Sequence, residues 1–245
     1  MILIHIKILL NKILLIVKGR KTIFKAIIIG GTGATGKQLL NQLINNQNCD
    51  LVTSIGRRPV LDGKKHDKLV DIVVESLFNL SSTEKYWEDN DVFFNCIGTT
   101  LQRAGGAKEF INIESGISNE AAKMAENAKI PHASVISAKG ANHEIWAKNW
   151  IHPLLYIKTI GQKEQTIISN FLFNNVSIFK PGMLIRLMDK QTWFEHFSES
   201  KGFGLRVDIL ASAMIHNAER VKLGLVEESP QYFIGNNHIK RSLEL

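Results

Sequence analysis

The strongest constraint on this chain is a glycine-rich turn that lies between an apolar run and a helical pattern. Residues 26–29 read Ala-Ile-Ile-Ile, which is typical of a central strand in a parallel sheet, where both faces are covered. Gly30, Gly33 and Gly36 follow at intervals of three, and apolar residues at helical spacing come after Gly36. A strand, a glycine turn and a helix in this order predict nucleotide binding. A tight turn without a ligand is the alternative.

Each glycine would have its own physical role in such a unit. Gly30 lets the chain turn sharply out of the strand, Gly33 lets the backbone approach a pyrophosphate, and Gly36 lets the helix pack close to the strand. The helix N-terminus then presents free N–H groups and a partial positive charge to the phosphates. The spacing G-x-x-G-x-x-G resembles that of extended and atypical short-chain dehydrogenases.

The end of the next apolar run, 51–55, indicates which dinucleotide is preferred. In an NAD-binding unit, an acidic residue about 20 positions after the glycines binds the ribose 2′-hydroxyl. Here Arg57 stands 21 residues after Gly36, and Arg58 follows it. Two guanidinium groups suit a 2′-phosphate, so we expect NADP(H). An exposed basic turn before a proline is the alternative.

Apolar runs and helical patterns alternate along most of the chain, which predicts right-handed crossovers and an α/β fold with a doubly wound parallel sheet. Further strands are expected at 71–75, at 91–100 including the exit from the strand, at 132–136, and at a segment ending near 179–182. Helices are expected near 115–128 and 207–214, a short helix or loop at 84–88, and a flexible connection at 101–109. From about residue 187 we expect a small substrate or lid region, in which Trp193, Phe194, Phe197 and Phe203 would form a pocket wall or pack in the core.

Residues 1–21 differ from the rest, and the Rossmann domain is expected at 22–245. Ile2 to Val17 is almost all Ile and Leu with basic interruptions, and no acidic residue precedes Asp50. Its apolar runs are too short to span a bilayer, and it lacks a small-residue cleavage site. Three interpretations stay open: a leader of mitochondrial type or one that contacts a membrane surface through residues 1–18, an extra element, or a misassigned start codon.

Charge, cysteine content and histidine spacing limit which ligands and which cell compartment are expected. The net charge of +7 indicates anionic partners, but the lysines are scattered without interleaved aromatics, so we expect a phosphorylated cofactor and no nucleic acid. Two cysteines, Cys49 and Cys96, are typical of a reducing compartment, so a cytoplasmic location is expected. The alternative is a mitochondrial location, at the outer membrane or associated with its surface. The histidines lack metal-ligand spacing such as H-x-x-x-H, so no metal site is expected.

Several motifs beyond the glycine triplet carry a family resemblance. They are Gly56-Arg57-Arg58, Asn95-Cys96-Ile97-Gly98-Thr99-Thr100, Ser137-Ala138-Lys139-Gly140-Ala141, Tyr156 with Gly161, and Phe179-Lys180-Pro181-Gly182. From about residue 24 to about residue 187 the chain resembles the Tat-interacting-protein oxidoreductase family, an atypical branch of the short-chain dehydrogenases. The resemblance implies an NADPH-binding Rossmann fold with a poorly defined substrate. It also implies, for some members, a regulatory role through protein partners and nuclear import.

The catalytic pair of such enzymes is incomplete in this sequence. A Tyr donates a proton to the carbonyl oxygen, and a Lys four residues later binds the nicotinamide ribose and stabilises the phenolate. Here Ile160 stands four residues after Tyr156. Lys158 lies on nearly the opposite side of the helix, and Lys163 lies about 10 Å along its axis. Two hypotheses follow: weak or altered reductase activity on a carbonyl-type substrate, or a regulator that binds the cofactor without turnover and works through protein partners.

The predicted site combines these motifs. Tyr156 and Ser137 are the catalytic candidates; Ser137 would bind the substrate carbonyl or else its own backbone. The residues predicted to bind the cofactor are Gly30, Thr32, Gly33, Ala34, Thr35, Gly36, Arg57, Arg58, Ile97, Gly98, Thr99, Tyr156 and Lys180. The segment 97–99 is included because ligands bind outside the carboxyl ends of parallel strands, and Lys180 because the resemblance implies a loop beside the nicotinamide. Arg186 is a further candidate for phosphate or substrate.

Overall fold

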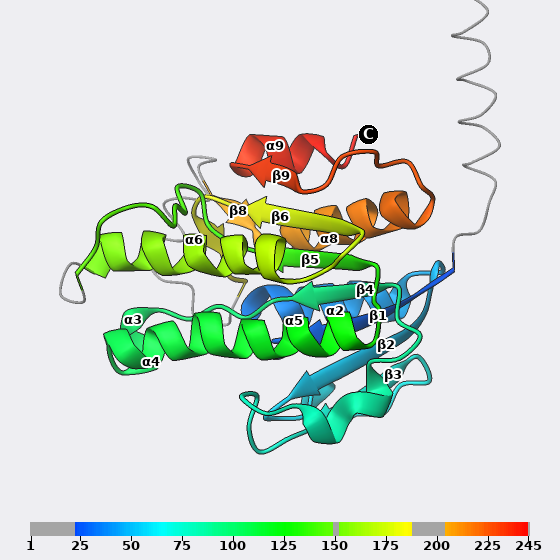
Figure 1. Cartoon of the computed structure of the whole chain (residues 1–245). Helices are drawn as coiled ribbons and strands as arrows, with labels where there is room; N and C mark the ends of the chain where they lie inside the picture. The colour runs from blue at the N-terminus through cyan, green and yellow to red at the C-terminus, as the bar shows by residue number, and fades with distance from the viewer. Residues whose placement is uncertain (1–22, 149–151, 188–203, 245) are drawn as a thin grey trace, which may run out of the picture.

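The structure is a computed structural model that describes residues 23–148, 152–187 and 204–244. Its centre is a seven-stranded sheet in the order β3-β2-β1-β4-β5-β6-β9, and every neighbouring pair is parallel (Figure 1). The strands are β1 (Phe24–Ile29), β2 (Cys49–Gly56), β3 (Leu69–Val73), β4 (Val92–Asn95), β5 (His132–Ile136), β6 (Asn175–Lys180) and β9 (Gln231–Ile234). A separate two-stranded pair consists of β7 (Leu184–Ile185) and β8 (Leu205–Arg206). The predicted doubly wound α/β fold is therefore confirmed.

Helices cover both faces of the sheet. They are α2 (Ala34–Asn45), η1 (Leu61–Gly63), η2 (Ser81–Tyr86), α3 (Leu101–Ala104), α4 (Ala107–Ile111), η3 (Asn112–Ile117), α5 (Ser118–Asn127), α6 (His152–Asn170), α8 (Val207–Lys222) and α9 (Asn236–Arg241). In Figure 1, α5 and α6 lie in front of the sheet, while α2 and α8 lie behind it. The chain thus forms three layers.

The alternation of side chains along β1 shows why two helical layers are needed. Ala26 and Ile28 belong to the apolar cluster under α2 and α8, whereas Ile27 and Ile29 belong to the cluster under α5 and α6. All four side chains are fully buried. Burying an aliphatic side chain of this size contributes about 1.5–3 kcal/mol, so a strand that is apolar on both faces is stable only between two layers.

The order of the strands also determines where a ligand can bind. From β1 the chain proceeds outward through β2 to β3, and then returns to the other side of β1 at β4. Helical crossovers on opposite faces leave a crevice at the carboxyl ends of β1 and β4, the usual ligand site of such sheets. The glycine turn after Ile29 and the segment after Asn95 therefore lie side by side.

Some local predictions were wrong. The segment 101–109, expected as a flexible connection, contains α3 and α4, because Thr100 caps α3 by accepting a bond from the Arg103 N–H, and Gly105, with φ of 86°, ends it. A π-helical turn, η3, precedes α5, and the third strand ends at Val73 rather than at residue 75. The edge strand β9 was not predicted. The residues of two further predictions, 1–21 and the set Trp193, Phe194, Phe197 and Phe203, lie outside the described residues.

Within the ranges that the structure describes, no helix combines the length and the apolar character needed to cross a membrane.

Candidate cofactor and active site

The glycine turn has the geometry that its sequence indicates. Gly30 has φ of 87°, and a Cβ there would lie 2.7 Å from the carbonyl oxygen of Cys96. A Cβ on Gly36 would lie 2.1 Å from the carbonyl oxygen of Gly30, so α2 packs on the turn backbone to backbone. Gly33 is the N-cap of α2 and offers no side-chain bond, which leaves the N–H groups of the first turn without acceptors inside the helix.

The turn opens onto a cleft of about 550 Å³. Nine of the predicted cofactor residues line it: Gly30, Thr32, Gly33, Ala34, Arg57, Arg58, Ile97, Gly98 and Thr99. Thr35 and Tyr156 line a smaller cavity of about 180 Å³ that shares several wall residues with the cleft. Gly36 and Lys180 line neither, because Gly36 is covered by Gly30 and the ammonium group of Lys180 binds other residues.

The cleft is strongly cationic. The basic side chains along its wall are Lys37, Arg57, Arg58, Arg103 and Arg186, and the described wall residues include no Asp or Glu. Lys37 and Arg103 were not among the predicted site residues. Lys37 could have been found, because it directly follows Gly36 in the first turn of the helix; Arg103 had no signal, since its segment was expected to be a flexible loop.

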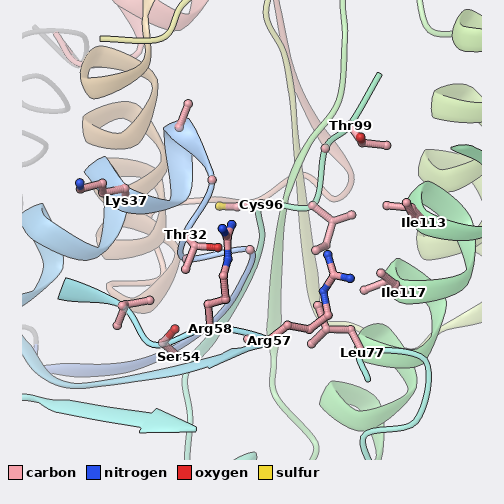
Figure 2. A pocket seen from close by; sticks show the side chains of 18 of the residues that line it. Thr32, Lys37, Ser54, Arg57, Arg58, Leu77, Cys96, Thr99, Ile113 and Ile117 are labelled. Carbon is pink, nitrogen blue, oxygen red and sulfur yellow. The ribbon is translucent and has the colours of Figure 1, made fainter. Parts of the chain in front are cut away.

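The guanidinium groups of the two predicted arginines point in different directions. Figure 2 shows the side chain of Arg58 directed toward Thr32, whereas that of Arg57 is directed toward Ile117 and Leu77. Arg58, Thr32 and Lys37 also line a hollow beside the glycine turn to which Arg57 does not contribute. The arrangement offers one anion-binding group next to the turn and a separate guanidinium group on the opposite wall.

The wall shared by the two cavities includes Cys96, a free and buried thiol. Burial raises its pKa to about 12, although the nearby ammonium group of Lys163 acts in the opposite direction. Because the thiolate is the nucleophilic form, Cys96 is an inert part of the wall. The second cysteine, Cys49, is also free and buried.

Tyr156 is half-buried in the smaller cavity, and its ring stacks on Phe110 with centroids 5.7 Å apart. Burial raises the pKa of its phenol, and the charge of Glu114 raises it further, while Arg186 partly opposes both. The hydroxyl therefore carries its proton at neutral pH. Ile160, only 3% exposed, lines the same cavity and supplies no cation.

Ser137, at the end of β5, also lines this cavity, but neither predicted role describes its contacts. Its hydroxyl donates to the carboxylate of Glu164 rather than to its own backbone. Lys180 Nζ donates to the other oxygen of Glu164 at 2.7 Å and to the carbonyl oxygen of Ala141 at 3.1 Å. With its proton directed at a carboxylate, Ser137 presents lone pairs to the cavity, so it suits a ligand hydroxyl better than a carbonyl. Lys180 lies behind Ser137 rather than at the cofactor cleft, contrary to the prediction.

Lys163 reaches the cavity of Tyr156 although it lies two helical turns further along α6. Its Nζ donates to Glu114 Oε2 at 2.9 Å and to the carbonyl oxygen of Ile97 at 3.3 Å. Lys163 shares a helix face with Tyr156, which is the one signal that its sequence position gave. Glu114 was missed, and no local pattern connects it with a lysine 49 residues away.

The fold and the site define this molecule as a Rossmann-fold protein of the short-chain dehydrogenase type. No protein-family model matches the chain. It is 35% identical over 167 residues to the protein "FMP52, mitochondrial" of Debaryomyces hansenii, a match that covers 65% of this chain and 66% of that protein. It is 32% identical over 161 residues to "FMP52-1, mitochondrial" of Scheffersomyces stipitis, covering 65% of this chain and 67% of the relative.

A mammalian relative extends the same family. Protein HTATIP2 of Rattus norvegicus is 29% identical over 164 residues, covering 67% of this chain and 63% of the rat protein. The chain belongs to the family of FMP52 and HTATIP2, which confirms the resemblance found in the motifs. The match spans slightly less than two thirds of the length of the D. hansenii and rat proteins.

Solved structures agree with the fold. The oxidoreductase ylbE from Lactococcus lactis superimposes with a TM-score of 0.60 at 16% identity, covering 90% of this chain and 95% of that one. MoeE5 in complex with UDP-glucose and NAD superimposes with a TM-score of 0.62 at 11% identity, covering 90% and 81%. At these identities the likeness supports the architecture alone.

Proposed function

We propose that this protein is an NADP(H)-dependent oxidoreductase that acts on a carbonyl-type substrate. The observation that carries the proposal is the cleft above the glycine turn, whose wall holds five basic side chains and, among its described residues, no carboxylate. A dinucleotide with a third phosphate is the anion that such a wall suits. Solved structures of this fold in complex with NAD, such as that of MoeE5, and membership in the family of HTATIP2 support a nicotinamide cofactor.

The extra phosphate would bind beside the glycine turn. Arg58, Lys37 and Thr32 line one hollow there and offer a guanidinium group, an ammonium group and a hydroxyl, and the exposed Asp62 lines the same hollow. Charge-assisted hydrogen bonds of this kind are about twice as strong as neutral ones. Arg57, on the opposite wall with Ile117 and Leu77, would instead contact the adenosine half through its planar guanidinium.

The chemistry at the other end would depend on Tyr156. A bound nicotinamide supplies or accepts a hydride. Tyr156 holds its proton at neutral pH and would donate it to the carbonyl oxygen of the substrate. In the alcohol product, the new hydroxyl would meet the lone pairs of Ser137, whose own proton is directed at Glu164. A hydrogen-bond acceptor at this position stabilises the alcohol product more than the carbonyl substrate.

A second candidate function rests on Ile160. Because an apolar side chain stands where the lysine of the catalytic pair is expected, the phenolate of Tyr156 lacks its usual support. A protein that binds the cofactor and regulates partners without turnover is consistent with this substitution. The two candidates make opposite predictions about turnover of NADPH by the wild-type protein.

The names of the fungal relatives bear on location. Several are called mitochondrial, and we extend the proposal to a mitochondrial location for this chain in preference to the cytoplasmic one. Residues 1–21 would serve as the leader. Fractionation of cells that express the full chain, with and without these residues, tests this; recovery of both forms in the cytosol would contradict it.

Fluorescence titration of the full chain with NADPH and with NADH tests the cofactor assignment. We expect NADPH to bind at least about tenfold more tightly, because a hydrogen bond to a charged group contributes about 1.5–3 kcal/mol. Arg58→Ala should remove this preference, whereas Arg57→Ala should weaken both cofactors alike. Arg241→Ala is the matched control, since Arg241 is exposed on α9 and lines neither cavity. A wild-type preference for NADH would overturn the assignment.

A further inference from the structure

The smaller cavity contains a buried ion pair that the proposed reaction does not use. Lys163 and Glu114 lie 2.9 Å apart, and each side chain is only 1% exposed. Burying two charges is costly, and apolar side chains of similar volume in place of such a pair are often as stable or more stable. Stability alone therefore gives little reason for these two residues, and their other contacts indicate what they do.

Both members of the pair bind the same short segment of backbone. Lys163 Nζ donates to the carbonyl oxygen of Ile97 at 3.3 Å, and Glu114 Oε1 accepts the N–H of Thr99 at 2.6 Å. Gly98, between them, is exposed, and a Cβ there would meet nothing within 4 Å. The exit from β4 is thus held by two side chains at its ends and is open in the middle.

This segment is where the two cavities meet. Ile97, Gly98 and Thr99 line both the cationic cleft and the cavity of Tyr156. A dinucleotide whose phosphates lie on the glycine turn would extend its nicotinamide half along this wall, at the carboxyl end of the strand next to β1. A displacement of the segment would change the width of the channel there.

The backbone that carries Glu114 provides an independent observation. Glu114 lies within η3, a π-helical stretch of six residues between α4 and α5. Wide turns of this kind are rare and are found frequently at functional sites. Here the wide turn carries a carboxylate that is completely buried and that meets both Lys163 and the N–H of Thr99.

We propose that Lys163 and Glu114 are positioning residues, which hold the segment 97–99 in the conformation that receives the nicotinamide half of the cofactor. The inference rests on the proposed function and adds to it a role for a lysine outside the usual catalytic pair. Lys163 brings an ammonium group into the cavity where Ile160 brings none, and Glu114 balances its charge. The pair therefore orders the wall without giving Tyr156 a net positive neighbour.

The test compares two ligands that share the adenosine half. The double variant Lys163→Met/Glu114→Leu removes both contacts without leaving an unpaired buried charge. We expect its affinity for NADPH to fall about tenfold, which is about 1.4 kcal/mol, while its affinity for adenosine 2′,5′-bisphosphate, which has no nicotinamide, stays unchanged. The melting temperature of the ligand-free variant should stay the same or rise. Equal affinities for NADPH in variant and wild type, or an equal loss for both ligands, would overturn the inference.

A matched control is the pair of Lys222 with Asp91, which lie 2.6 Å apart beside the amino end of β4. Lys222→Met should leave both affinities unchanged. If wild type binds neither ligand, the proposed function fails and this inference fails with it; if wild type binds both, the comparison concerns the pair alone.

Hydrogen exchange in the wild-type protein provides a readout that does not depend on whether a variant folds. The amide of Thr99 donates to a buried carboxylate, so it should exchange much more slowly than the amide of Gly98, which is an exposed residue. Exchange of the two amides at similar rates in the ligand-free protein would overturn the inference.

Discussion

Substituting Ile160 by lysine is the most direct test of whether the site is a complete but weakened reductase. Ile160 is 3% exposed, lines the cavity of Tyr156 and lies one helical turn from it. Residues four apart on a helix have Cβ atoms about 5–6 Å apart, so the new ammonium group would lie beside the phenol. Lys163 cannot have this effect, because Glu114 neutralises it.

The expected size of the effect follows from the electrostatics of the cavity. Burial and Glu114 now hold the pKa of Tyr156 above its ordinary value. A positive charge within about 4–6 Å lowers the pKa of an acid by about 1–3 units, and one unit corresponds to about 1.36 kcal/mol. If that energy also stabilises the phenolate in the transition state, reduction should be about tenfold faster or more. Burying the ammonium group will at the same time lower the free energy of unfolding.

Two assays separate the electrostatic effect from the loss of stability. The pKa of Tyr156 is measured as the phenolate absorbance that is lost in a matched Tyr156→Phe variant, and turnover is measured as NADPH oxidation with simple aldehydes and ketones. Ile160→Met is the control, since it is of similar size and has no charge. An unchanged pKa in Ile160→Lys would refute the electrostatic reasoning. Turnover by wild type that equals that of the lysine variant would instead contradict the regulator hypothesis.

Two predictions concern stability. Gly36→Ala would place a Cβ 2.1 Å from the carbonyl oxygen of Gly30, so α2 must move, and thermal denaturation should show that the free energy of unfolding falls by about 1–3 kcal/mol. Gly98→Ala, whose Cβ would meet nothing within 4 Å, should have the melting temperature of wild type. Equal melting temperatures for the two variants would refute this account of the packing. Burial lowers the pKa of His132 to about 3, and a lowered pKa means that folding is most favourable above the unfolded value of about 6.5. The free energy of unfolding should therefore fall by about 1.4 kcal/mol per unit as the pH drops from about 6.5 toward 3. Urea denaturation should show a shallower fall for His132→Gln. An identical fall in both proteins would show that burial does not lower the pKa of His132 in the folded state.

The glycine unit could be predicted from the sequence because its signals are local. An apolar strand, a glycine triplet and a helical pattern occupy consecutive residues, and each glycine has a steric reason that depends on near neighbours in the chain. The geometry of Gly30 and Gly36 confirmed those reasons. The tertiary partners of more distant residues had no such signal.

The arrangement of Arg57 and Arg58 was partly accessible from sequence. The sequence identified the turn as basic, but it gave no signal for the direction of each guanidinium group. Arg57 and Arg58 lie in a bend that follows β2, and the structure directs Arg58 toward Thr32 and Arg57 toward Ile117.

The position of Lys163 in the site was also difficult to predict from the sequence. Measured along the helix axis, this residue seemed too far from Tyr156 to share its cavity. However, Cα–Cβ bonds in a helix tilt toward its N-terminus, and a lysine side chain is long, so its ammonium group can extend back over Ile160. The structure places Lys163 and Tyr156 in one cavity. No spacing rule predicts the contact of Lys163 with Glu114, because it forms only when the fold brings η3 and α6 together.

Helix α6 therefore organises the reactive end of the site through two consecutive residues of opposite charge. Lys163 reaches the exit of β4 through Ile97, and Glu164 reaches the end of β5 through Ser137 and the end of β6 through Lys180. Position 161 is glycine, where a Cβ would lie 2.4 Å from the backbone of residues 142–143, so α6 packs directly against this loop after β5. Since α6 also carries Tyr156, a shift of this one helix would move the proton donor and three strand ends together. A substitution at position 161 should therefore impair both cofactor binding and proton transfer, although residue 161 lines neither the cofactor cleft nor the cavity of Tyr156.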